Sequence, residues 1–198
     1  MKIQQYLLVL LEVLFPYMLN ADITEDIHFS HIGLEEGLSH STIFAINQDK
    51  GGNLWFATYD GVNKYDGYNF TVYRHQYTHP NSIASDISRC ITMDDSDRIW
   101  IGTREGLSLY NHYKDEFSNY YYKRNGLNVA VTSIIPIKKD WLMLGTAEGI
   151  LLFDVKKECF LSDTLSSSLH GLQPAALVRQ DDCILSLIHI SEPTRHAQ

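Results

Sequence analysis

The chain has 198 residues, and its composition, 44% hydrophobic and 12% aromatic, is that of a protein with a sizeable buried core. The formal net charge is −8 at pH 7. Because a nucleic-acid-binding surface needs a basic patch, this acidic balance argues against a nucleic-acid partner.

The first 21 residues resemble a secretory signal peptide. Lys2 supplies the positive start, Tyr6–Leu11 and Val13–Phe15 supply the apolar segment, and Leu19-Asn20-Ala21 is a plausible cleavage site. The apolar run is interrupted by Glu12 and is shorter than the roughly 18 to 20 residues that span a bilayer. We expect export with removal of residues 1–21. A retained amphipathic or anchoring segment is the alternative.

Residues 22–40 predict a lead-in to the fold. A short strand is expected over Ile27–Ile32, followed by the turn-rich segment Gly33–Ser39. His28, His31 and His40 fit no standard zinc spacing, so we interpret them as surface histidines and expect no metal.

One sequence pattern then recurs three times. Trp55, Trp100 and Met143 share its first marked position, Thr58, Thr103 and Thr146 follow three residues later, and Gly61, Gly106 and Gly149 follow after three more. Thr58 and Thr103 are 45 residues apart, and Thr103 and Thr146 are 43 apart. A period of about 40 to 50 residues is typical of four-stranded propeller blades. The apolar residues alternate or form short β-branched and aromatic blocks, which predicts strands and not helices.

The repeat sets the expected blades. We assign residues 41–84, 85–130 and 131–174 to three blades and residues 175–184 to the start of a fourth. In the second copy the strands are expected at Ile87–Met93, Ile99–Gly102, Leu107–Tyr110 and Glu116–Tyr121, with turns at Asp94–Asp97 and at Gly106, where glycine supplies positive φ. The predicted fold class is therefore all-β: an open, incomplete propeller of about three to three and a half four-stranded blades.

Large aromatic side chains at a fixed phase indicate packing between blades. A Trp can bury about 150 to 250 Å², so Trp55 and Trp100 are expected to fill the space between adjacent sheets, and Met143 should pack more softly in the third. Pro136 leaves the boundary of its strand open. The run Tyr120–Tyr122 could stack against sugars, but cross-strand packing is the favoured interpretation.

The repeats resemble the two-component regulator propeller repeat, found in the N-terminal sensor region of Bacteroides-type hybrid two-component sensor histidine kinases. The matching positions are Asp49, Gly52, Leu54, Trp55, Thr58, Gly61, Tyr65 and Asp66 in the first copy and Asp94, Ile99, Trp100, Gly102, Thr103, Gly106, Leu107 and Tyr110 in the second. The resemblance implies a periplasmic sensor, homodimeric in the full-length protein and anchored to the membrane only through a downstream region. A glycan fragment is the implied ligand.

Loops at one rim of the blades are the candidate ligand site. The turns between second and third strands should share this rim with the connections between blades, so rigidly held aromatic and charged residues would gather there. The candidate residues are Tyr59, Asp60, Arg74, His75, Arg104, Glu105 and Glu148. A solvated rim with no binding function is the alternative.

No catalytic residue and no cofactor is expected, because the chain contains no glycine-rich nucleotide loop and no kinase phospho-acceptor context. A sialidase-like propeller glycosidase is one alternative, since Asp49-x-Gly51 and Asp95-x-Asp97-x-x-Trp100 superficially resemble an Asp-box. A protein-interaction scaffold is another. Cys90, Cys159 and Cys183 form no C-x-x-C motif; Cys90 should be a buried small apolar residue, and pairing is left open.

The last residues interrupt the repeat. Residues 185–198 resemble the in-frame translation of a transposase adapter, so we expect them to lie outside the fold and the chain to be the N-terminal piece of a longer protein.

Overall fold

The computed structural model describes residues 29–138, 140–146, 149–161, 174–180 and 183–188. The expected signal segment, residues 1–21, lies outside them. The chain divides into two units, residues 1–31 and residues 32–198, and the described strands belong to the second. No helix in the described ranges is long or apolar enough to cross a lipid bilayer.

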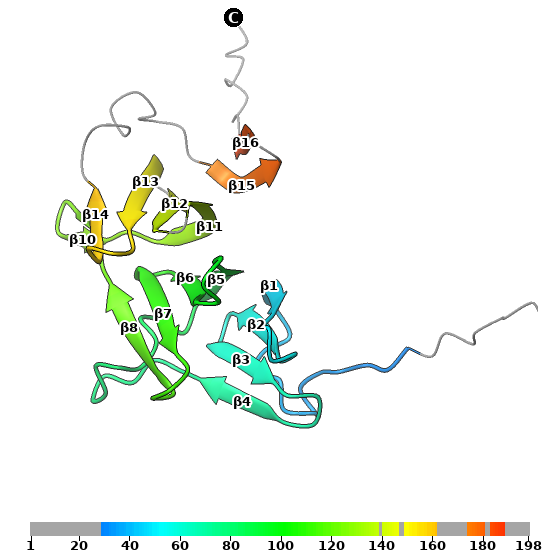
Figure 1. Ribbon diagram of the computed structural model, residues 1–198. Helices are drawn as coiled ribbons and strands as arrows, with labels where there is room; N and C mark the ends of the chain where they lie inside the picture. The colour runs from blue at the N-terminus through cyan, green and yellow to red at the C-terminus, as the bar shows by residue number, and fades with distance from the viewer. Residues whose placement is uncertain (1–28, 139, 147–148, 162–173, 181–182, 189–198) are drawn as a thin grey trace, which may run out of the picture. The chain divides into compact units, whose positions relative to one another are not determined.

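Three four-stranded antiparallel sheets follow one another along the chain, and in each the strand order in space equals the order in sequence (Figure 1). The first contains β1 (Ile43–Gln48), β2 (Leu54–Thr58), β3 (Val62–Tyr65) and β4 (Phe70–Tyr73). The second contains β5 (Ser88–Met93), β6 (Ile99–Thr103), β7 (Leu107–Asn111) and β8 (Glu116–Tyr120). The third contains β11 (Val131–Lys138), β12 (Trp141–Thr146), β13 (Gly149–Asp154) and β14 (Cys159–Leu161).

Two smaller elements complete the described fold. The hairpin β9 (Lys123–Arg124) and β10 (Leu127–Asn128) lies between the second and third sheets in sequence, and β15 (Pro174–Gln180) pairs with β16 (Cys183–Ile188). Each sheet meets the next through its inner strands, since β5 contacts β1 and β2, β11 contacts β5 and β6, and β15 contacts β11 and β12. This arrangement is a series of propeller blades, and it confirms the predicted fold class.

The core lies between blades. Trp55 is 1% exposed and its ring centroid lies 4.8 Å from that of Tyr110 in the second blade. Trp100 is fully buried and meets Phe153 of the third blade edge to face, at 5.7 Å. The prediction that these two indoles fill the spaces between successive sheets is confirmed. Edge-to-face contacts of this kind add to the burial of the rings.

Each indole also has a hydrogen-bond acceptor that the sequence analysis did not identify. Trp55 Nε1 donates to Asp49 Oδ2 at 2.9 Å, and Trp100 Nε1 donates to Asp94 Oδ2 at 2.8 Å. Both aspartates begin the turn between the first two strands of their blade. A buried indole N–H needs such a partner, and these carboxylates provide it within the same blade.

The third blade lacks both members of this pair. Met143 occupies the indole position, and the turn between β11 and β12 has two residues, 139–140, where the first two blades have five, 49–53 and 94–98. Met143 instead packs with Ile135 and Ile150. Because a thioether has no N–H to satisfy, the acceptor-bearing turn is not needed there.

The turns at the rim are held by a threonine and a glycine. Thr103 Oγ1 donates to Gly106 O at 3.0 Å, and the same bond in the first and third blades joins Thr58 to Gly61 at 2.9 Å and Thr146 to Gly149 at 2.7 Å. The three glycines have φ of +92°, +153° and +124°. A Cβ on Gly61 would lie 2.3 Å from Tyr73 O. Positive φ and close backbone approach therefore both require glycine.

Several boundaries differ from expectation. Residues 29–32 form no strand, because none of the described strands pairs with them. Pro136 lies within β11, opposite Leu142; β11 is an edge of its own sheet, where a missing N–H is tolerated. Pro174 begins β15 and does not end the third blade. β16 continues to Ile188, past residue 184, where the fold was expected to end; three of the four residues 185–188 are apolar, which is compatible with a strand.

The cysteine prediction is partly supported. Cys90 and Cys159 are free thiols. Cys90 Sγ lies so close to Gly102 that a Cβ there would be 2.4 Å away, and burial raises the pKa of this thiol to about 12. Gly102 therefore permits the close approach of Cys90 from the neighbouring strand.

Candidate functional site

Backbone hydrogen bonds bring the connections between blades to the turns that follow the second strands. Gly61 N donates to Asp86 O at 2.6 Å, and Arg104 N donates to Ile87 O at 2.9 Å. The long connection 74–87 between β4 and β5 is thus fixed against the turns of both neighbouring blades. Loops held in this way by a rigid scaffold are common binding surfaces.

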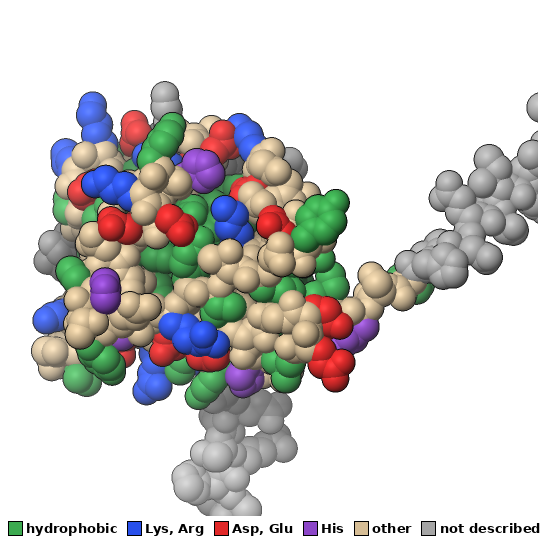
Figure 2. All heavy atoms as spheres, turned by 90° about the horizontal axis from the view of Figure 1, so that it is seen from below, with side chains coloured by type: hydrophobic (Ala, Val, Ile, Leu, Met, Phe, Trp, Pro, Cys, Tyr) green, Lys and Arg blue, Asp and Glu red, His purple; other side chains and the backbone are tan. Residues whose placement is uncertain are grey.

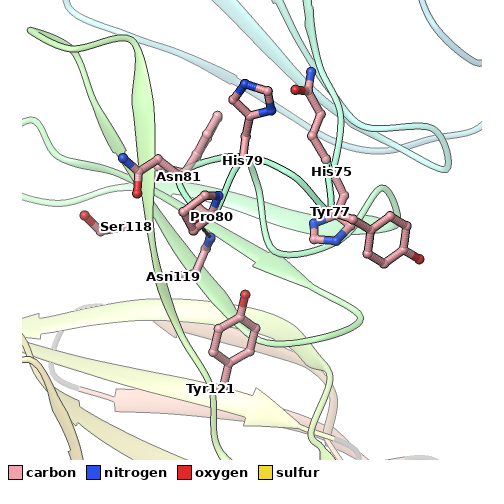
Figure 3. A pocket seen from close by; sticks show the side chains of 10 residues that line it. His75, Tyr77, His79, Pro80, Asn81, Ser118, Asn119 and Tyr121 are labelled. Carbon is pink, nitrogen blue, oxygen red and sulfur yellow. Dashed lines mark hydrogen bonds between the residues drawn. The ribbon is translucent and has the colours of Figure 1, made fainter.

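Two adjoining hollows open at this rim. The first, of about 460 Å³, is bordered by uncharged polar side chains including Gln76, Asn81, Ser118 and Asn119, and we call it the amide hollow (Figure 3). The second, of about 520 Å³, is bordered by Asp86, Arg104, Glu105 and Asn128, and we call it the charged hollow. His75, Tyr77 and Tyr121 border both.

Charged groups at the rim differ in how they are satisfied. Arg74 makes a forked ion pair with Asp60, with Nε 3.1 Å from both carboxylate oxygens and Nη2 2.9 Å from Oδ2. The hydrogen bond from Arg74 holds the pKa of Asp60 below its ordinary value. Within the described part of the chain, no ion pair or hydrogen bond engages the exposed Arg104 guanidinium. Arg104 is therefore a cation at this rim that can meet a ligand.

Each of the two carboxylates of the charged hollow uses one of its oxygens in a hydrogen bond. Asp86 Oδ1 accepts from His75 N at 2.6 Å, and Glu105 Oε2 accepts from Asn128 Nδ2 at 2.9 Å. These bonds orient the side chains and leave the second oxygen of each as an acceptor. Asn128 Oδ1 is buried and has no hydrogen-bond partner in the described residues.

His75 is fixed by its own loop. Its Nδ1 lies 2.8 Å from Ile83 O, and because a carbonyl only accepts, Nδ1 carries the proton and Nε2 remains available. Its ring meets Tyr77 edge to face, with centroids 4.8 Å apart.

The tyrosine run at the end of the second blade divides into two roles. Tyr120 packs against Phe153, with ring centroids 4.9 Å apart, and Tyr122 packs against Phe160, at 5.6 Å. Both rings therefore pack, as expected, but against the third blade and not across the strands of their own sheet. Tyr121, between them, is 44% exposed and points into the rim, where Figure 3 shows its ring rising toward Asn119 and Pro80.

The sequence-predicted site residues are only partly brought together. His75, Arg104 and Glu105 share the charged hollow, while Asp60 and Arg74 neutralise each other beside it. Tyr59 is half exposed and packs instead against His40 and Phe44. Glu148 lies outside the described residues.

The residues of the charged hollow that were not predicted as site residues include Tyr77, Asp86, Tyr121 and Asn128. Strand alternation gave one available signal, because the middle residue of three tyrosines at a strand end must face away from the outer two. No local pattern marks Asp86 or Asn128, whose positions depend on the folded connections.

The described ranges contain no cluster of three or more His, Cys, Asp or Glu side chains suited to a metal ion. Figure 2 shows acidic and basic side chains interspersed over one face, with no continuous basic patch on that face.

A family model described as the two component regulator propeller matches residues 37–60 and 82–105. Each matched segment runs from the lead-in of a blade, through its first two strands, to the rim turn. Residues 37–60 and 82–105 are thus two-component regulator propeller repeats. The Trp–Asp pairs and the Thr–Gly turns of the first two blades all fall within or next to these matched repeats.

Part of the chain is also similar to a curated protein. Histidine kinase P4 of Formosa agariphila is 47% identical over 49 residues, which are 25% of this chain and 4% of that protein.

Solved structures are similar to this chain in fold. The extracellular domain of the hybrid two component system BT3049 of B. thetaiotaomicron is similar at 26% identity and a TM-score of 0.66, over 81% of this chain and 26% of that one. The extracellular domain of BT4673 from the same organism is similar in fold, at 17% identity and a TM-score of 0.63, over 78% of this chain and 20% of that one. The chain thus spans about a quarter of the length of these domains.

Proposed function

We propose that this chain is the N-terminal, ligand-sensing part of the extracytoplasmic propeller of a hybrid two-component sensor histidine kinase, and that it senses glycan fragments in the periplasm. The regulator propeller repeats and the likeness to extracellular domains of two-component systems support the sensor role and the location.

The charged hollow is the observation that carries the glycan assignment. It places the planar polar groups of Asp86, Arg104, Glu105 and Asn128 beside the exposed rings of Tyr77 and Tyr121. Carboxylate, guanidinium and amide groups hydrogen-bond neighbouring hydroxyls in pairs, and aromatic faces receive the C–H face of a sugar ring.

In this proposal the glycan signals by population shift. A homodimer, anchored through a region downstream of this chain, has two arrangements that control the kinase. A ligand that binds one arrangement more tightly moves the equilibrium by its difference in affinity.

The glycosidase alternative is not supported by its candidate residues. Asp49 accepts the indole hydrogen bond of Trp55, and Asp97 pairs with Lys50 at 2.6 Å. Both lie in turns between first and second strands, so they act in the structure and not in a carboxylate pair facing a glycosidic bond.

The test is binding of oligosaccharides to the purified chain. Cellotriose, xylotriose, mannotriose, galactotriose and acidic trisaccharides would be compared by calorimetry and thermal unfolding, with free monosaccharides as the control. A ligand at 100 times its Kd stabilises by about 2.7 kcal/mol, which raises Tm by roughly 5 to 10 °C for a chain of this size. Absence of binding across the panel contradicts glycan sensing and favours a protein-interaction scaffold, and release of sugar products favours the glycosidase.

A further inference from the structure

The amide hollow and the charged hollow form one groove, because both are bordered by His75, Tyr77 and Tyr121. These three side chains lie where the two hollows meet. A ligand that fills both hollows therefore passes these side chains, the Tyr121 ring among them.

Tyr121 is built to act as a platform. Its ring lies over Gly106, where a Cβ would be 3.3 Å from Tyr121 Cδ1, so the glycine lets the ring settle against the turn. The neighbouring Tyr120 and Tyr122 are anchored in the third blade. A ring fixed in this way and still 44% exposed offers a preorganised apolar face at little entropic cost.

The charges of the groove are unbalanced toward the negative. None of the described residues bordering the amide hollow is Lys, Arg, Asp or Glu. The charged hollow has two carboxylates, Asp86 and Glu105, against one guanidinium, Arg104. The nearby Arg74 is already neutralised by Asp60. A carboxylate or sulfate on the ligand would be repelled by this net negative charge. Hydroxyl groups on the ligand can instead donate to the free carboxylate oxygens and accept from Arg104.

We infer that this groove binds a neutral oligosaccharide, with one sugar unit on each side of Tyr121, and discriminates against uronate-containing and sulfated chains. This inference rests on the proposed function and names the ligand class and the groove that would carry it.

The decisive comparison is galactotriose against trigalacturonic acid, both α-1,4-linked, by calorimetry on the intact chain in low salt. Cellotriose, xylotriose and mannotriose extend the neutral set. The neutral trisaccharide that binds best is expected to bind at least 10-fold tighter than trigalacturonic acid. The double variant Asp86→Asn, Glu105→Gln should narrow that gap, because it removes the repulsion.

Substitutions at Tyr121 test whether this groove is the binding site. Tyr121→Ala should weaken neutral binding at least 10-fold, whereas Tyr121→Phe, which keeps the ring, should stay within about 3-fold. Tyr113→Ala is the matched control, since Tyr113 is 98% exposed but borders neither hollow, and it should change nothing. The emission of buried Trp55 and Trp100 checks that each variant is folded.

The possible outcomes distinguish a failure of the neutral-ligand inference from a failure of glycan sensing itself. Tighter binding of the acidic trisaccharide overturns the neutral-ligand inference and leaves glycan sensing intact. If Tyr121→Ala binds the neutral oligosaccharide as tightly as the unaltered chain does, the groove is not the binding site. Absence of binding by every neutral and acidic oligosaccharide overturns both.

Discussion

Trp100 Nε1 and Asp94 Oδ2 lie 2.8 Å apart in the second blade, and Trp55 and Asp49 repeat the same hydrogen bond at 2.9 Å in the first. The third blade has Met143 in the indole position and a shorter turn. Indole and carboxylate are therefore present or absent together, because a buried N–H is stable only with an acceptor.

Asp94→Ala should destabilise the second blade. Asp94 also accepts from Ser96 N at 2.9 Å and Arg98 Nε at 2.6 Å, so its removal leaves several donors without a partner. We expect a loss of roughly 3 kcal/mol in the free energy of unfolding, measured with urea. Asp95→Ala, an exposed neighbour in the same turn, is the control and should cost less than about 0.5 kcal/mol. Equal losses in the two variants would show that the pair is not structural.

Thr103→Val should cost more than Thr103→Ser. Thr103 Oγ1 donates to Gly106 O and accepts from Gly106 N at 3.2 Å, in a fully buried position. Valine has the same shape but leaves Gly106 N without an acceptor, while Gly106 O keeps only the bond from Thr103 N at 2.8 Å; the cost is roughly 1 to 3 kcal/mol. Serine keeps the hydroxyl and loses about 1 kcal/mol for one methyl. Urea unfolding ranks the two variants, and the reverse order would contradict the role assigned to the hydroxyl.

Gly106→Ala should be more damaging than Gly52→Ala. Both glycines have positive φ, but a Cβ on Gly106 would lie 2.6 Å from Tyr120 O, whereas Gly52 has nothing within 4 Å. In each variant the positive φ lowers the free energy of unfolding by about 1 kcal/mol. In Gly106→Ala the steric overlap of the new Cβ with Tyr120 O lowers it by roughly 1 to 3 kcal/mol more. Thermal unfolding measures the difference. Similar Tm values for the two variants would argue against close packing at this turn.

Stability should fall at high pH through a tyrosine pair. Tyr73 and Tyr110 both donate to Asp115 Oδ1 at 2.6 Å. Burial, with these bonds, raises the pKa of Tyr110 to about 12 and that of Tyr73 well above its ordinary value. The folded state therefore holds protons that the unfolded state releases near pH 10, so this stability is present below pH 10 and is lost between about 10 and 12.

The same cluster predicts the opposite behaviour in acid. Hydrogen bonds from Tyr110 and Tyr73 lower the pKa of Asp115, so its contribution is present above about pH 4 and is lost as the pH falls through its folded value. Tyr73→Phe with Tyr110→Phe should flatten both limbs of a pH–stability curve measured with urea. If this variant loses stability above about pH 10 as steeply as the unaltered chain does, groups other than Tyr73 and Tyr110 cause that loss.

The repeat made the blades predictable. Trp55, Trp100 and the glycines at Gly61, Gly106 and Gly149 are marked in the sequence because packing and positive φ demand particular residue types at a fixed period. The rim was less predictable. His75, Arg104 and Glu105 follow from topology, but Asp86 and Asn128 reach the charged hollow through irregular connections that no period governs.

Hydrogen exchange with a saturating neutral oligosaccharide tests the central claim most directly. The account predicts slower exchange in residues 74–87, 104–106 and 121–128, which form the groove, and unchanged exchange in the opposite turns, residues 49–53 and 94–98. Protection confined to those opposite turns, or no protection anywhere, would contradict it.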